Sequence, residues 1–448
     1  MHLRLAWTVT VASLCSALLI SCAGGGSSST HPAGLIPASG NSAGALGARG
    51  GGRRPDSVPS CSGLGTGAFV GGGFENVADG AYSGVLEGNS NEVCDEESAV
   101  GGGYYNFISS GANTSYYSWI GSGYDNTIGG NGYQSVIGGG NVNTLTAPNS
   151  VIGGGNQNTL AASDSVIAGG SSNSDTSAAS YSAIGGGSGS RMSSEYGVIS
   201  GGNNNNVSAD KYGAIGGGNG NSVSGHAAVV GGGAANGAGG QWATVPGGVF
   251  NVASGTASFA AGYNSAAATD GAYVWSDYAS GAAKLASTSP NQFLARASGG
   301  FSLWTNAANT VGATLPSGSG TWASASDRKM KTDVVRIDDA AVLDRVSRLP
   351  ISKWSYISER GVHHLGPMAQ DFYAAFGVGE DDKHITSIDE DGVALAAIKA
   401  LHAENAQLRA QQRNLRAQLA AITALQSQQA LAVARLSAAV ASLRTTMP

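Results

Sequence analysis

The side chains of this chain that could do chemistry gather in its last quarter. Residues 326–448 carry 15 Lys and Arg and 14 Asp and Glu side chains, whereas residues 62–325 carry 4 and 14. The last quarter opens with the run Ser-Asp-Arg-Lys-Met-Lys, from Ser326 to Lys331. A serine hydroxyl becomes a strong nucleophile when a neighbouring base takes its proton, and a lysine amine can act as such a base only when it is neutral.

Several short motifs follow this run in a fixed order. They are Ser326-Asp327 with Lys331, then Leu349-Pro350, His364-Leu365-Gly366, Ala369-Gln370 and a closing Ala-Ile-Lys-Ala-Leu at 397–401. Their order and spacing resemble the C-terminal intramolecular chaperone domain of phage tailspikes and tail fibres of the endosialidase type. The resemblance implies an α+β domain that registers three chains and then cuts its own backbone.

The resemblance also implies a role for each matching residue. The scissile bond is Ala325–Ser326, Ser326 is the nucleophile and Lys331 is its base, while His364 and Gln370 orient or stabilise the tetrahedral oxyanion. Burial in a trimer would desolvate Lys331, so cleavage should await assembly. Two alternatives stay open: His364 can be a structural hydrogen-bonded histidine, and the domain can keep its fold without cutting. The expected activity is therefore a single-turnover serine autopeptidase without an external substrate.

Neither a cofactor nor a metal ion is expected. The Gly clusters lack the Lys of a phosphate-binding loop, and the seven His residues are not spaced as ligands of a catalytic zinc. The acidic runs at 380–382 and 389–391 do not match a calcium-binding helix-loop-helix and are interpreted as solvated loops. Asp327 is equally well explained as a helix or turn cap.

A second pattern is a repeat in the middle of the chain. The chain has 71 Gly among 448 residues, and from residue 68 to about 265 the Gly clusters recur with a period of about 15. The apolar residues that precede the clusters are Val70, Leu86, Val100, Ile120, Ile137, Ile152, Ile167, Ile184, Ile199, Ile215, Val230, Val245 and Ala260. A short apolar strand, a Gly cluster, a second short strand and a polar turn in each block predict a solenoid that buries one continuous apolar column. Asn141, Asn143, Asn156 and Asn158 suit tight turns and side-chain ladders between stacked coils.

The blocks resemble the head of trimeric autotransporter adhesins, a left-handed parallel β-roll in which three chains pack side by side. The resemblance implies a homotrimer with a possible host or surface ligand. A nucleic-acid partner is disfavoured, because residues 62–325 carry a net charge of −10. Residues 291–306 alternate enough to predict a β-hairpin after the repeat.

The C-terminus changes to a heptad pattern. The d positions are Leu401, Leu408, Leu415, Ile422, Gln429, Leu436 and Leu443, and the a positions are Ile398, Asn405, Gln412, Leu419, Gln426, Val433 and Val440. Ten of these fourteen sites are apolar, which predicts a parallel coiled coil with polar layers that set the register. The heptads alone do not fix the number of strands, but both resemblances point to three. A single amphipathic surface helix is the alternative.

The N-terminus reads as an export signal. Arg4 and an apolar run precede Leu19-Ile20-Ser21-Cys22, which resembles the lipobox of bacterial lipoproteins, so Cys22 is expected to be acylated and to begin the mature chain. Plain secretion is the alternative. The expected location is the outer membrane or cell surface of a Gram-negative bacterium, with membrane attachment through the lipid. Cys61 and Cys94 then remain as one expected disulfide in an oxidising compartment, or else as two buried thiols.

Together these patterns predict a mainly β chain: a left-handed parallel β-roll, an α+β chaperone domain and a C-terminal trimeric coiled coil. The expected segments are a signal peptide 1–21, a lipidated tether 22–60, the repeat 61–275, a β connector 276–325, the chaperone and peptidase domain 326–397 and the coiled coil 398–448. The favoured function is a lipid-anchored trimeric fibre that cleaves itself at Ala325–Ser326. The alternative is a structural surface adhesin that the coiled coil holds as a trimer and that is never cut.

Overall fold

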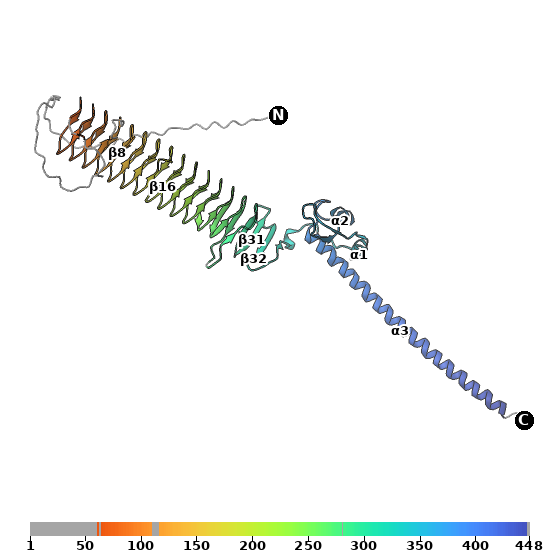
Figure 1. The fold of residues 1–448 in the computed structure, drawn as a ribbon. Helices are drawn as coiled ribbons and strands as arrows, with labels where there is room; N and C mark the ends of the chain where they lie inside the picture. The colour runs from red at the N-terminus through yellow and green to blue at the C-terminus, as the bar shows by residue number, and fades with distance from the viewer. Residues whose placement is uncertain (1–60, 62–63, 110–115, 280, 446–448) are drawn as a thin grey trace, which may run out of the picture. The chain divides into compact units, whose positions relative to one another are not determined.

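The chain divides into two units, with the boundary in the sequence between Ser298 and Gly299. The computed structural model describes residues 61, 64–109, 116–279 and 281–445 (Figure 1), so the expected signal peptide, lipid site Cys22 and tether 22–60 lie outside the described residues. The first unit is a parallel β-solenoid of about 13 turns. The second unit holds a three-stranded sheet, a small α+β region and a long helix.

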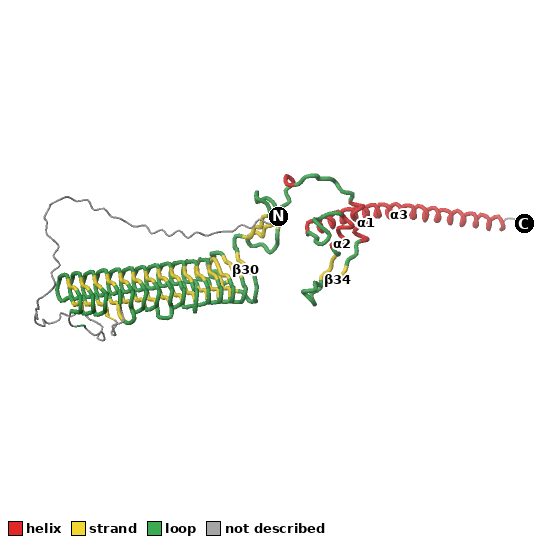
Figure 2. Tube along the Cα trace, turned by 90° about the horizontal axis from the view of Figure 1, so that it is seen from above, coloured by secondary structure: helices red, strands yellow, loops and turns green. Residues whose placement is uncertain are grey.

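Each turn of the solenoid gives one short strand to each of two parallel sheets, as the tube in Figure 2 shows. The 16-stranded sheet contains β1 (Phe69–Val70), β3 (Gly84–Val85), β5 (Ala99–Val100), β7 (Trp119–Ile120), β9 (Val136–Ile137), β11 (Val151–Ile152), β13 (Val166–Ile167), β15 (Ala183–Ile184), β17 (Val198–Ile199), β19 (Ala214–Ile215), β21 (Val229–Val230), β23 (Thr244–Val245), β24 (Gly248–Val249), β26 (Phe259–Tyr263), β28 (Tyr273–Ser276) and β30 (Phe293–Arg296). The 14-stranded sheet contains β2 (Val77–Ala78), β4 (Glu92–Val93), β6 (Phe107–Ser109), β8 (Thr127–Gly129), β10 (Thr144–Leu145), β12 (Thr159–Leu160), β14 (Ser174–Asp175), β16 (Arg191–Met192), β18 (Asn206–Val207), β20 (Ser222–Val223), β22 (Gly237–Ala238), β25 (Val252–Ala253), β27 (Ser265–Ala267) and β29 (Leu285–Ala286).

The register places equivalent residues of successive turns directly beside one another. Ile152 pairs with Ile137 on one side and with Ile167 on the other, and all three side chains are fully buried. The predicted apolar column and its period are thereby confirmed. One position was wrong: Leu86 is 53% exposed, and the column passes through Val85, which pairs with Val70. The pairing fixes which residue of a strand faces inward, because a shift by one residue would turn every side chain to the other face.

A ladder of buried asparagines runs along the solenoid beside the apolar column. The Nδ2 of Asn143 donates to the carbonyl oxygens of Gly139 and Gly155 at 3.1 and 3.0 Å, and its Oδ1 accepts from the backbone N–H of Asn158 at 3.0 Å. Gly140, with φ of 98°, lies where an added Cβ would sit 2.2 Å from the Gly155 oxygen. The predicted ladder is confirmed at Asn143 and Asn158, whereas Asn141 lies exposed at the surface.

We expect Asn143→Ala to destabilise the solenoid strongly. The change leaves the Asn158 N–H and the Gly139 carbonyl without their partners inside the stack, whereas the Gly155 carbonyl keeps the N–H of Asn141. Each buried unpaired group costs about 1–3 kcal/mol. The free energy of unfolding in urea should fall by about 2–4 kcal/mol. Asn141→Ala, in the same turn, is the matched control and should change it by less than about 0.5 kcal/mol. Equal effects of the two changes would contradict the ladder's role.

In most two-residue strands of the solenoid the second residue faces the core. Asp175 is the one acidic side chain among these core-facing residues. It is 1% exposed and lies between Leu160 and Met192, its partners in neighbouring turns. Desolvation raises the pKa of its carboxyl to about 7, although the hydroxyl of Ser182, which donates to it, acts in the lowering direction. The folded chain therefore prefers the neutral acid.

This preference predicts a stability that falls as the pH rises. Between pH 4 and pH 7 the folded chain keeps the proton of Asp175 and the unfolded chain releases it, so unfolding becomes easier throughout that window, by about 4 kcal/mol in all. Asp175→Leu, which copies Leu160 of the preceding turn, should remove this decline in urea unfolding measured at pH 4, 6 and 8. The exposed Asp164→Asn should leave it in place. A decline that persists in Asp175→Leu would show that other groups cause it.

The solenoid continues beyond the expected end of the repeat at residue 275. β28 pairs in parallel with β30, so the stacking reaches Arg296. The predicted hairpin in 291–306 does not form, because β30 stays in the solenoid. Instead β31 (Gly300–Trp304) pairs antiparallel with β32 (Gly312–Pro316), which pairs with β33 (Ala323–Ser324).

The rest of the second unit is a small α+β region followed by a long helix. After the 3-10 helix η1 (Arg328–Met330), helix α1 (Asp339–Arg348) precedes a two-stranded sheet of β34 (Ser352–Trp354) and β35 (His364–Gly366), then α2 (Ala369–Phe376) and α3 (Ser387–Thr445). Helix α1 packs on α3, and the Lys399 Nζ lies 2.5 Å from the Asp339 carboxylate. None of the helices in the described residues is both long and apolar enough to cross a membrane.

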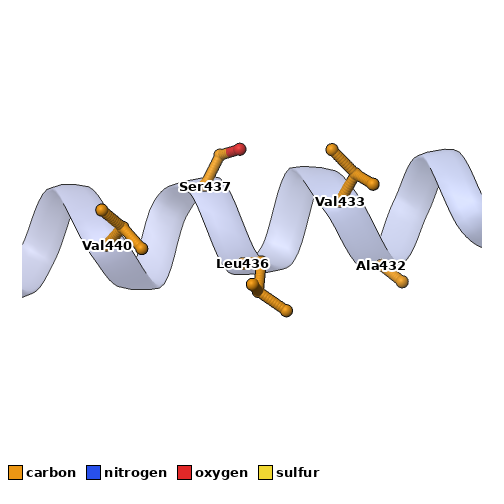
Figure 3. Close-up of a pocket in the computed structure, with 5 residues that line it drawn as sticks. All are labelled: Ala432, Val433, Leu436, Ser437 and Val440. Carbon is orange, nitrogen blue, oxygen red and sulfur yellow. The ribbon is translucent and has the colours of Figure 1, made fainter.

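Helix α3 is 59 residues long and begins 11 residues before the expected coiled-coil boundary at 398. The described part of the chain leaves its heptad leucines uncovered: Leu408 is 60% exposed and Leu415 is 64% exposed. Figure 3 shows Val433, Leu436 and Val440, which also belong to the a and d positions, standing out from the helix. A bare apolar stripe along such a helix fits a coiled coil.

Candidate active site

A single turn of chain brings the expected nucleophile and base together. The N–H of Ala325 donates to the Gly312 carbonyl at 3.1 Å, which ties the chain to β32 just before Ser326. The Asp327 carboxylate then accepts from the N–H of Lys329 at 2.9 Å and so caps η1, which confirms the cap interpretation of Asp327. Because η1 has only three residues, the chain reverses within one turn and returns Lys331 toward Ser326.

The side chains of Ser326 and Lys331 touch directly. The Lys331 Nζ donates to the Ser326 Oγ at 2.6 Å. Both residues are exposed in the single chain, as is every residue from Ala323 to Asp338. A lysine amine so close to a serine hydroxyl can take its proton only after the amine itself has lost one, and loss of that proton is favoured by removal from water.

The other two expected site residues lie elsewhere in the second unit. His364 pairs with Trp354 across β34 and β35, its ring centroid is 4.7 Å from that of Trp354, and its Nε2 lies 3.6 Å from the Glu359 carboxylate. Gln370 is exposed near the start of α2. Among the described residues, no side-chain hydrogen bond joins either of them to Ser326 or Lys331. The structure thus brings two of the four expected catalytic residues together.

Sequence reasoning missed the surroundings of His364. The Nε2 of His364 and the Nε1 of Trp354 are both shielded from solvent and have no hydrogen-bond partner in the described part of the chain. Tyr356 packs against the same imidazole at 5.6 Å between ring centroids. The alternation of Ser352, Lys353 and Trp354 is a weak strand signal that could have indicated the pairing partner of His364.

The cysteines of the solenoid are joined to each other. Cys61 and Cys94 form a disulfide with their Cα atoms 5.5 Å apart. With Glu92 they make up the one group of three possible metal ligands found in the described residues. Because both sulfurs are used in the disulfide, neither is a thiolate, the form of cysteine that binds metals.

Comparison with known proteins finds a family match in the second unit. Residues 326–377 match the model of a peptidase family described as "Chaperone of endosialidase". The match begins at Ser326 and supports the prediction of a tail-fibre-type chaperone segment after a β-solenoid. It covers 52 of the 448 residues and ends before α3. No curated protein matches the chain.

Proposed function

We propose that this chain forms an exported, lipid-anchored homotrimeric fibre whose C-terminal segment assembles three chains and then cuts the Ala325–Ser326 bond. One observation carries the proposal: the Lys331 amine lies 2.6 Å from the Ser326 hydroxyl at the first residue of the chaperone family match. The bare heptad stripe of α3 supports self-association, and the family suggests a trimer.

The cleavage proceeds in two steps, the formation of an ester on Ser326 and its hydrolysis. Neutral Lys331 takes the proton of Ser326 Oγ, which forms a bond to the carbonyl carbon of Ala325 and places negative charge on the carbonyl oxygen. Collapse of this intermediate breaks the C–N bond, the released Ser326 nitrogen takes the proton from Lys331, and Ala325 is held as an ester on Oγ. Water then hydrolyses the ester, which leaves a carboxylate on Ala325 and a free amine and hydroxyl on Ser326.

Assembly of the trimer would supply the neutral Lys331 amine that the first step needs. Ser326 and Lys331 are open to water in the single chain. Covering by neighbouring chains would desolvate Lys331 and make cleavage wait for the trimer. Arg328 and Lys329 add to the effect if assembly brings their charges close to the amine. His364 and Gln370 would then act on the oxyanion from neighbouring segments.

The N-terminal part gives the fibre its attachment and body. Cys22 carries the lipid, residues 22–60 tether the body to the membrane, and residues from 61 onward form the fibre, a left-handed roll in the proposed trimer. The mature product is residues 22–325, and residues 326–448, 123 in number, are released or stay bound. In the manner of an adhesin, the solenoid would bind a host or surface ligand.

The alternative is a structural adhesin that is never cut. The Asp327 cap favours it, because the cap explains the turn at 326–331 without any catalytic role. Refolding of the purified full-length chain from urea, without other proteins, separates the two functions by intact mass. The proposal expects a fragment of residues 326–448 with Ser326 at its N-terminus. A chain that stays intact while it forms a trimer would establish the structural function instead.

A further inference from the structure

The two sheets of the solenoid differ in the side chains that they turn outward. In the two-residue strands the second residue faces the core, so the first faces away from it. In the 14-stranded sheet these outward positions are mainly polar and include Glu92, Thr159, Arg191 and Asn206. In the 16-stranded sheet none of them is charged, and large apolar side chains recur along the whole length.

In the 16-stranded sheet the strands lie side by side from β1 through β3 and β5 to β30, and β24 lies off this path. The outer column is the set of first residues of the strands on this path. Its exposed members include Phe69, Trp119, Val166, Val198, Val229 and Phe293. At its C-terminal end the rings of Phe259, Tyr273 and Phe293 stack with centroids 4.5 and 4.9 Å apart. Thr244 is the one position of the column with an aliphatic hydroxyl. An apolar stripe of this length on a solvated face is unusual for a chain that acts alone.

The size of this face suits a stable interface. Fifteen strands at a spacing of about 4.8 Å extend over roughly 70 Å. A strand of two residues is about 7 Å long, so the stripe offers on the order of 500 Å². Stable protein interfaces bury about 800 Å² on each partner. The outer column therefore provides more than half of the area that one such contact needs.

We infer that the outer column is the face by which the solenoids of neighbouring copies of this chain pack together. The inference rests on the proposed trimer and adds the surface that holds its body together. A second copy is the fitting occupant, because an uncharged apolar face complements itself and because association through α3 would hold the solenoids of neighbouring chains at high local concentration. The tether 22–60 is an unsuitable cover, since its Gly- and Ser-rich sequence has no apolar period.

Charge placed on this face tests the inference in the full-length chain. In the double variant Val166→Lys and Val198→Lys we expect cleavage to continue, because the C-terminal segment still assembles. The released 22–325 body should then sediment as a single chain. The matched control, Thr159→Lys and Ser222→Lys on outward positions of the 14-stranded sheet, should give a cleaved body that still sediments as three chains.

The outcomes separate this inference from the proposed function. A wild-type chain that sediments as a monomer contradicts the proposed trimer. A wild-type body that falls apart after cleavage, or a Val166→Lys and Val198→Lys body that remains three chains, overturns the outer column as the interface.

Oxidative cross-linking keeps the test valid if the lysine variant fails to fold. Val166→Cys should give a cross-linked pair of chains and Thr159→Cys should not. The reverse pattern would assign the contact to the 14-stranded sheet.

Discussion

Ser326→Ala is expected to leave the chain whole. Removal of the hydroxyl abolishes the nucleophile, whose loss in comparable hydrolytic sites reduces turnover by a factor of about 10³ or more. On a denaturing gel the wild type should therefore give two fragments and the variant one band of full length. Trimer formation, measured by sedimentation, should be unchanged, because Ser326 is exposed and caps no element.

Matched changes in the same turn show whether this loss is specific. Ser324→Ala alters an exposed serine two residues earlier and should be cut like the wild type. Lys331→Arg keeps the positive charge but places a guanidinium, which does not lose its proton in proteins, beside Ser326, so cleavage should stop. Lys329→Arg, in the same turn, should cut normally. Cleavage of Ser326→Ala at the wild-type rate would refute the roles of Ser326 as nucleophile and Lys331 as base.

The double change Leu408→Glu and Leu415→Glu is expected to abolish both assembly and cleavage. Both leucines are d positions with more than half of their surface bare in the single chain, and carboxylates there would meet their own copies across the coiled-coil seam. Sedimentation should show single chains, and the gel should show one uncut band. The solenoid should keep its circular dichroism, because it is a separate unit.

The control for this double change lies on the same helix. Ala410→Glu and Ala417→Glu occupy f positions of the same two heptads, which face away from the seam, so the trimer and the cleavage should persist. A monomeric Leu408→Glu and Leu415→Glu chain that is still cut would show that cleavage does not depend on assembly. That result would contradict the proposed order, in which assembly precedes cleavage, but would leave the roles of Ser326 and Lys331 in place.

The solenoid could be predicted from the sequence because its signal is local and repeated. Gly clusters at a period of about 15 fixed the two strands of each turn, and the pairing of Ile137, Ile152 and Ile167 followed. The register at Leu86 could not be read in the same way, since Val85 and Leu86 are both apolar and only the neighbouring turns decide which one faces inward. β30 was missed as a solenoid strand because its turn lacks the Gly cluster.

The site was predictable only where it is local. Ser326 and Lys331 are five residues apart, and a single capped turn brings them together. His364 is paired with Trp354 through a strand contact across a loop, which no spacing in the sequence expresses. In the proposed trimer the desolvation of Lys331 would come from other copies of the chain, and the single folded chain leaves this side chain exposed.

The order of assembly and cleavage distinguishes a trimer-dependent autopeptidase from a chain that is cut as a monomer or never cut. The purified full-length chain is refolded from urea at a series of concentrations, and native mass spectrometry follows chain number and chain length together over time. We expect that uncut trimers form first, that the 326–448 fragment then arises within trimers, and that monomers at high dilution stay whole. Fragment 326–448 in monomers at every dilution, or trimers that remain uncut indefinitely, would contradict this expectation.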